Sequence, residues 1–154
     1  MKKILVVSDN HGHSSKLNNV RYMHQDVDYK VHCGDSEFKR DYLDDFIAVR
    51  GNNDFNGGFP VYEIINNVEG HTILVIHGDG YVFMDHREPL VEMARDFNAD
   101  IVFFGHTHVF EDLKIDGIRL INPGSLAHNR DRTSTCYAIV TIDKNDIKVQ
   151  RIDV

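Results

Sequence analysis

Histidine, aspartate and asparagine side chains gather in five short segments, each directly after an apolar run of the sequence. The segments are Ser8–Gly12, Gly34-Asp35, Gly51–Asp54, His77–Asp79 and Gly105–His108. Imidazole nitrogens bind zinc, manganese, iron or nickel in proteins, and carboxylate oxygens suit hard divalent ions. These residue types could therefore hold metal ions that activate water for hydrolysis.

The segments contain more candidate ligands than one tetrahedral ion can use. A lone histidine near a strand end is usually a satisfied polar residue, but seven residues of these types together favour metal binding. Asp35 is the expected bridge between two ions, because a carboxylate has two oxygens. Two metals about 3.5–4 Å apart stabilise both the attacking and the leaving oxygen in phosphoryl transfer. The predicted ligands are Asp9, His11, Asp35, Asn52, His77, His106 and His108.

Two pairs of these ligands, Asp9 with His11 and His106 with His108, have one residue between them. On an extended backbone, residues two apart point the same way. We therefore expect each pair to face one site, and Thr107 to point away from it.

Five apolar runs precede the segments and are expected to form strands. They are rich in valine, isoleucine and leucine, which is typical of buried strands. In open α/β sheets, binding sites lie at the carboxyl ends of the strands, so the five loops are expected to converge. The predicted strands are Lys3–Ser8, Tyr29–Cys33, Phe46–Arg50, Thr72–His77 and Ile101–Phe104.

Helices are expected from Ser14 or Ser15 to about His24, and from His86 to Asn98. Ser14 or Ser15 would cap the first helix. Asp85 would cap the second helix, with Pro89 in its first turn. A short solvated helix is expected over 41–45. Hairpins are predicted for 61–65 with 72–77, for 111–115 with 118–121, and for 136–142 with 147–152. This order predicts one layered α/β domain over residues 1–154, with two packed sheets.

Composition restricts the partners. The chain has 154 residues and a net charge of −7, without a run of lysine or arginine, so long nucleic acid is not favoured. No apolar run approaches the ~20 residues of a membrane helix. The sequence shows no export signal, and Cys33 and Cys136 are too few for a disulfide scaffold. We therefore expect a cytoplasmic protein.

The five motifs, in this order, resemble those of the calcineurin-like metallophosphoesterase superfamily. They read DxH, GD, GN-x-D, HG and GHTH. The size resembles the smallest branch, the bacterial and archaeal phosphodiesterases related to the metal-binding retromer subunit. The resemblance extends from Asp9 to the loop at 122–125 and the closing strands. It implies an α/β fold, a four-layer α/β/β/α sandwich of two mixed sheets flanked by helices.

The resemblance also implies roles for the ligands. Asp9, His11, Asp35 and His108 would hold one metal, and Asp35, Asn52, His77 and His106 would hold the other. A bridging water or hydroxide would attack the phosphorus in line. Manganese is the expected metal, with nickel, zinc, iron and magnesium as alternatives. The residues expected to take part in catalysis are Asp35, Asn52, Asn53 and His106.

Asn53 departs from the family pattern. Many relatives have a histidine here, a proposed proton donor to the leaving group, and the small branch often has cysteine. An amide does not titrate and cannot act as a general acid, although it can hydrogen-bond a phosphoryl oxygen. His13 is the candidate substitute acid, and Arg130 is the candidate phosphate-binding residue.

Four functions remain open. The first is a dinuclear metal-dependent phosphodiesterase that hydrolyses small phosphodiesters or nucleotides. The alternatives are a phosphomonoesterase, a non-catalytic metal-binding interaction scaffold like the retromer relative, and a nuclease. The acidic charge disfavours the nuclease, and the complete ligand set favours an enzyme over a scaffold. The sequence leaves open whether the protein forms a homo-oligomer. Relatives often form dimers or higher assemblies.

Overall fold

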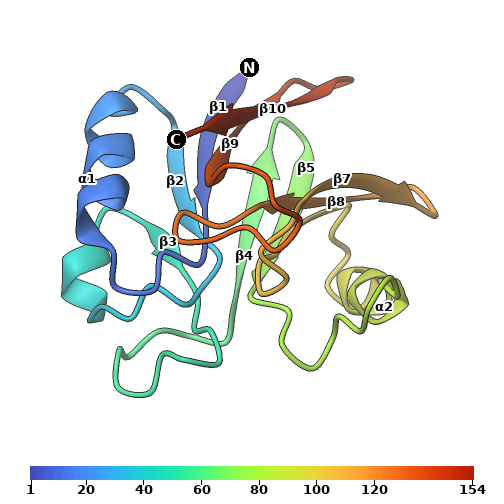
Figure 1. Ribbon diagram of the computed structural model, residues 1–154. Coiled ribbons are helices and arrows are strands. Elements are labelled where there is room, and N and C mark those ends of the chain that lie inside the picture. The colour runs from blue at the N-terminus through green and yellow to red at the C-terminus, as the bar shows by residue number, and fades with distance from the viewer.

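The computed structural model describes residues 1–154 as two five-stranded sheets packed face to face, with a helix on each outer side (Figure 1). The first sheet has the strand order β10-β9-β1-β2-β3, and the second has the order β4-β5-β6-β8-β7. The first sheet comprises β1 (Lys2–Val7), β2 (Tyr29–His32), β3 (Ile47–Ala48), β9 (Cys136–Ile142) and β10 (Ile147–Asp153). The second comprises β4 (Tyr62–Val68), β5 (His71–Ile76), β6 (Ile101–Phe103), β7 (Phe110–Ile115) and β8 (Ile118–Pro123).

Three apolar clusters hold four layers together. Successive side chains of a strand point to opposite faces, so in β1 Val6 joins the cluster between the sheets while Leu5 packs toward helix α1 (Ser14–Met23). On the second sheet, Leu74 packs with Leu90 of helix α2 (Glu88–Asp96). The predicted four-layer α/β/β/α sandwich is therefore confirmed.

Both sheets are mixed, and their parallel strands position the site. β1 pairs in parallel with β2, and β2 with β3, while β5 pairs in parallel with β6 and β6 with β8. β1 starts beside the N-terminus at the top of Figure 1, and its carboxyl end points toward the loops below. Each predicted ligand segment follows the carboxyl end of one of these parallel strands, as the sequence predicts.

The hairpin predictions are confirmed. β7 and β8 pair around the turn after Ile115, and β9 and β10 pair around the turn after Ile142. β4 and β5 also pair, with a register shift between Ile65 and Val68. β4 ends at Val68, three residues after the predicted end of this strand. The third strand is shorter than predicted, with only two residues, Ile47–Ala48. The predicted short helix is a 3-10 helix, η1 (Arg40–Leu43).

The predicted helix caps are wrong. α1 begins at Ser14 itself, with His13 in the capping position, so the serine is already helical. Asp85 does not cap α2, because residues 83–86 close a turn through the backbone of Phe83 and His86 before the helix starts. The proline expected in the first turn of α2 does lie there. Neither helix has the length and apolarity that crossing a membrane requires.

His71 links the two sheets at the start of β5. Its Nδ1 donates to Asp100 Oδ2 at 2.6 Å, and its Nε2 donates to the backbone oxygen of Asp143 at 3.3 Å. Burial disfavours the charged imidazole, but the hydrogen bond to Asp100 outweighs burial, so the pKa of His71 is raised. A raised pKa in the folded state stabilises the fold fully below the unfolded pKa. This contribution is lost as the pH rises through the folded value.

Replacing His71 by glutamine should therefore destabilise the protein in a pH-dependent way. We expect the free energy of unfolding to fall by up to ~1 kcal/mol at about pH 5.5, and by less at about pH 8.5. Urea unfolding of both proteins at the two pH values measures the difference. His86→Gln is the control, because the His86 side chain is 72% exposed. Equal destabilisation at both pH values would contradict a charged His71.

Candidate metal centre

The five ligand-bearing loops meet at one end of the two sheets. In the first group, His108 Nε2 lies 3.2 Å from Asp9 Oδ1 and 3.1 Å from His11 Nε2. In the second group, His77 Nε2 lies 3.3 Å from Asp35 Oδ2 and 3.0 Å from Asn52 Oδ1. His106 Nδ1 is 3.2 Å from the same Asn52 oxygen. The fold thus brings all seven predicted ligands together.

Two carboxylates lie between the histidine groups. Asp35 Oδ2 is 3.8 Å from His11 Nε2 in the first group and 3.3 Å from His77 Nε2 in the second. Asp9 Oδ1 also faces both groups, at 3.2 Å from His108 and 3.9 Å from His77. Asp9, His11 and His108 place their ligand atoms within 4.8 Å of one another, as do Asp9, Asp35 and His77. The site therefore has two adjoining sets of donors.

The donor atoms fit a divalent cation. Asp9 Oδ1 is buried and receives no hydrogen bond, a costly arrangement that a cation would relieve. His77 and His108 each donate their Nδ1–H to a backbone oxygen, of Cys33 and His128 respectively, at 2.7 Å. This second contact fixes the ring so that Nε2 faces the carboxylates, as metal-binding histidines require.

The electrostatics of the site follow from this packing. Burial opposes ionisation of Asp9, but the neighbouring imidazoles of His108 and His11 outweigh it and hold the pKa of Asp9 well below its usual range. Burial likewise opposes the charge on His77. The hydrogen bond to Asp35 and the charges of both aspartates overcome it and raise the pKa of His77 to about 9. The carboxylates therefore draw positive charge to the centre.

His32, which precedes the Gly34-Asp35 segment, has a structural role. Its Nε2 donates to Asn10 Oδ1 at 2.7 Å, and its Nδ1 accepts the backbone N–H of Gly34 at 3.1 Å. Complete burial lowers the pKa of His32 to about 4, so the ring is neutral. It orders two ligand loops without itself facing the metal groups.

The ligand loops have an unusual backbone. The prediction that Asp9–His11 and His106–His108 are extended is wrong, because all four end residues have left-handed φ angles between 44° and 71°. Asp35 is also left-handed, with φ of 57°. This conformation costs roughly 1–2 kcal/mol per residue and persists where the surroundings enforce it, often at functional sites. Each pair nevertheless faces the centre, while the Thr107 hydroxyl accepts a hydrogen bond from Asn122.

Two glycines leave room for the ligand carboxylates. A Cβ on Gly51 would overlap Asp35 Oδ1 and lie 2.7 Å from Asp35 Cγ, and a Cβ on Gly105 would lie 2.6 Å from Asp9 Oδ2. Neither glycine has a positive φ. The close approach of backbone to carboxylate requires glycine at both positions.

Several supporting residues were missed in the sequence. Ser8 donates to the Asp9 carboxylate, and Ser125 Oγ donates to the Asp9 backbone oxygen at 2.8 Å. Glu37 Oε2 accepts the Nδ1–H of His11 at 2.9 Å. The resemblance includes the loop at 122–125, which contains Ser125, but no pattern in the sequence singles out Ser8 or Glu37.

Asp54 orders the loops. Its carboxylate accepts the backbone N–H groups of Asp35, Glu37 and Gly51 at 2.8–2.9 Å. Asn53, the departure from the family pattern, donates its backbone N–H and its Nδ2 to the Asp35 carboxylate at 2.8 and 3.0 Å. The position that varies in the family therefore contacts the expected bridging ligand.

The two candidate supporting residues differ in their placement. His13 is exposed at the start of α1, and no hydrogen bond joins its ring to the ligands. Arg130 Nη1 donates to the backbone oxygen of His106 at 3.3 Å, so its guanidinium lies beside a ligand loop. Arg130 thus lies beside the predicted ligands, whereas no contact links His13 to them.

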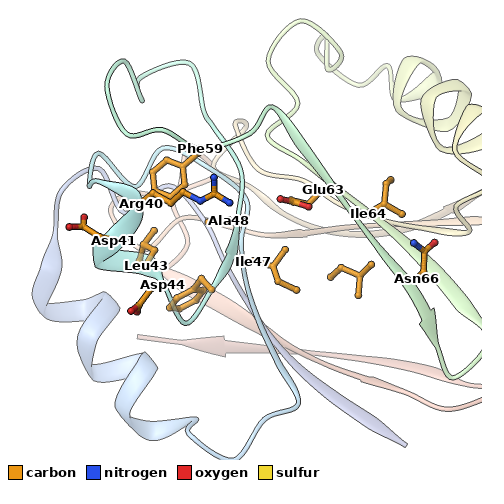
Figure 2. Close-up of a pocket in the computed structure, with 12 residues that line it drawn as sticks. Arg40, Asp41, Leu43, Asp44, Ile47, Ala48, Phe59, Glu63, Ile64 and Asn66 are labelled. Carbon is orange, nitrogen blue, oxygen red and sulfur yellow. The ribbon is translucent and has the colours of Figure 1, made fainter.

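A hollow of about 760 Å³ lies away from this centre. It runs between the outer edges of β3 and β4 and is covered by η1, with Ile47, Phe59 and Ile64 among its lining residues (Figure 2). None of the seven predicted ligands lines it. A smaller pocket of about 310 Å³ adjoins Asn53.

A two-sheet α/β/β/α sandwich with carboxylates and imidazoles clustered at the carboxyl ends of its strands is the architecture expected of the metallophosphoesterase class. The chain belongs to the calcineurin-like phosphoesterase superfamily, whose domain matches residues 1–145. The resemblance seen in the sequence motifs is thereby confirmed. The chain is similar to the probable metallophosphoesterase YsnB of Bacillus subtilis strain 168, with 33% identity over 153 residues, 97% of this chain and 90% of that protein.

Solved structures agree with this family. A conserved uncharacterized protein of Streptococcus pneumoniae TIGR4, described as a predicted phosphoesterase, matches with a TM-score of 0.91 and 31% identity, over 99% of this chain and 89% of that one. An archaeal phosphodiesterase shares the fold at 20% identity, with a TM-score of 0.74 and coverage of 97% and 99%. Vps29 of Entamoeba histolytica, complexed with zinc, shares it at 23% identity, a TM-score of 0.74 and coverage of 98% of each chain.

Proposed function

We propose that this protein is a dinuclear metal-dependent phosphodiesterase that hydrolyses small phosphodiesters or nucleotides. The observation that carries the proposal is the position of Asp35, whose Oδ2 lies between His11 of one donor set and His77 of the other. A carboxylate shared by two histidine groups is the arrangement that two neighbouring divalent ions need. The fold shared with an archaeal phosphodiesterase supports diesters as the substrate.

The seven predicted ligands would bind two metal ions. Asp9, His11 and His108 would hold one ion, Asn52, His77 and His106 the other, and Asp35 both. Divalent ions bound there, manganese first among them, would lower the pKa of water and neutralise charge on the phosphoryl oxygens.

Other side chains of the centre would orient the ligands and the substrate. The backbone oxygens of Cys33 and His128 keep His77 and His108 facing inward. Arg130, beside His106, would bind a phosphoryl oxygen through its guanidinium. We also propose the cytoplasm as the location, because the free thiols of Cys33 and Cys136 suit a reducing compartment.

An assay with paired substrates tests this function. The protein, purified without chelator, is supplied with Mn²⁺ and given bis-p-nitrophenyl phosphate and p-nitrophenyl phosphate side by side. We expect metal-dependent cleavage with the diester faster, and two ions per chain by elemental analysis. Faster cleavage of the monoester would replace the proposal with a phosphomonoesterase. Absence of metal-dependent turnover of either ester would leave the interaction scaffold.

Replacing Asn53 by histidine should restore a proton donor. The backbone of residue 53 lies beside the Asp35 carboxylate, whose negative charge favours a protonated imidazole. General acid catalysis contributes about 10²–10⁴-fold, mostly with poor leaving groups. We therefore expect cleavage of methyl phenyl phosphate to rise roughly 10-fold, with little change for methyl p-nitrophenyl phosphate.

The control for this variant is Asn66→His, which changes an exposed asparagine on β4 outside the centre. It should alter neither rate. An equal gain of Asn53→His on both esters would argue against a missing general acid and for a change in substrate or metal binding.

A further inference from the structure

A small pocket lies directly beside the metal centre. It has a volume of about 310 Å³, at the lower end of the range for sites that hold small organic ligands. It is formed by the loops that follow β2 and β3, and its lining includes Glu37, Lys39, Asn53, Phe55 and Asn56. No predicted metal ligand lines it.

Two lining residues connect this pocket to the centre. Asn53 donates to both oxygens of Asp35, and Glu37 accepts the ring N–H of His11. The pocket therefore begins one side chain away from the proposed ligands. A substrate with its phosphorus at the centre would extend one ester group into it.

The walls of the pocket are held in place without a ligand. The Asp54 carboxylate binds the backbone of Asp35, Glu37 and Gly51, which ties the two loops together at their base. Farther out, the backbone N–H of Arg40 donates to the oxygen of Gly57 at 2.9 Å. A preformed pocket of this kind binds without the entropy cost of ordering loops.

The lining combines one free aromatic face with polar groups. Phe55 is 83% exposed, although its ring would gain from contact with an apolar or aromatic surface. The other lining aromatic, Phe38, already packs against Tyr42, with ring centres 4.4 Å apart and the ring planes tilted by 42°. Lys39, Asn56 and Glu37 supply hydrogen-bond donors and acceptors around the ring. An acyl chain would make no hydrogen bonds to these exposed groups, whereas a flat ring with polar edges can cover the Phe55 ring and bond to them as well.

We propose that this pocket binds the nucleobase of a nucleotide phosphodiester, stacked on Phe55 and hydrogen-bonded at its edges by Lys39 and Asn56. The inference rests on the proposed phosphodiesterase function and narrows its substrates to nucleotides. Stacking on an aromatic side chain accepts any base, because every base has a π face. Selectivity for the base over a bare sugar phosphate is therefore the property to test.

Direct binding can be measured without turnover. The protein contains no tryptophan, so Phe55→Trp adds one fluorescent reporter at an exposed position. The variant is titrated with adenosine 5′-monophosphate and with ribose 5-phosphate, which lacks the base, with and without Mn²⁺. We expect quenching by the nucleotide and none by the sugar phosphate at the same concentration. Equal responses to the two, or no response to the nucleotide, would overturn the proposal.

Kinetics give an independent test. Adenosine 5′-phosphate and ribose 5-phosphate are each supplied as the trifluoroethyl diester, so that the leaving alcohol has no ring. Phe55→Ala should raise KM about 10-fold for the adenosine ester and leave KM for the ribose ester unchanged. Tyr22→Ala, which removes an aromatic side chain of 75% exposure on α1, should change neither value. Equal changes with both esters in Phe55→Ala would overturn the proposal.

The two proposals can fail separately. If bis-p-nitrophenyl phosphate is cleaved but Phe55 does not distinguish the adenosine ester from the ribose ester, the phosphodiesterase stands and the nucleobase pocket falls. If no ester is cleaved, the phosphodiesterase falls, and the fluorescence titration still decides whether the pocket binds a base.

Discussion

Replacement of Asp35 by asparagine should reduce metal-dependent phosphodiester cleavage by more than about 100-fold, the loss typical of removing a group that merely orients a metal ligand. The Asp35 carboxylate lies 3.8 Å from His11 and 3.3 Å from His77. An amide of the same size removes the negative charge and one of the two oxygens. Both donor sets would then lose the group they share.

Elemental analysis and rate measurements on the Asp35→Asn protein check this result, together with its unfolding temperature. We expect fewer than two ions per chain in a folded protein. The matched control is Asp44→Asn, which removes a carboxylate from an exposed position after η1 and should keep full activity. Full activity of Asp35→Asn would show that the bridge is assigned to the wrong residue.

The second large effect is expected at Gly51, where a single methyl group should inactivate the centre. A Cβ on this residue would lie 2.7 Å from Asp35 Cγ and would overlap the carboxylate oxygen. Because the φ of Gly51 is not positive, the cost of Gly51→Ala is steric rather than torsional. Overpacking of this kind costs about 1–3 kcal/mol of stability. The shift of Asp35 should abolish detectable cleavage.

The control for Gly51→Ala separates stability from activity. Gly70, in the turn between β4 and β5, has φ of +86° and open space around a would-be Cβ. Gly70→Ala should therefore lose about 1–2 kcal/mol through its left-handed backbone and keep its activity. Chemical unfolding and the diester assay on both variants give the comparison. An active Gly51→Ala protein would mean that the Asp35 position tolerates displacement.

Much of this architecture is present in local sequence patterns. Continuous valine, isoleucine and leucine runs gave the buried strands, and the hairpins after Ile115 and Ile142 pair as predicted. The ordered motifs gave the superfamily, the four layers and the seven residues that the fold gathers. These signals are local, since strand periodicity and turn residues act over a few positions of the chain.

Where the predictions failed, backbone hydrogen bonds determined the local conformation instead. Hydrogen bonds from the Asp9 and His11 amides to the loop after β2, at 3.0 Å each, accompany the left-handed turns that replace the predicted extended pairs. The Phe83–His86 turn delays the start of α2. The conformational energy of these turns is offset by contacts with residues of neighbouring loops, which the spacing of the sequence does not reveal.

The sequence by itself determined which side chains are available for metal binding and the order of the strands that carry them. Only the tertiary structure decided which of these side chains lie next to one another, because His11 meets His108 across 97 positions of the chain and Ser125 reaches Asp9 across 116. It also placed Asn53 against Asp35 and left Phe55 free beside them. Such contacts depend on how two sheets pack through a shared core, and core packing is a property of the whole chain.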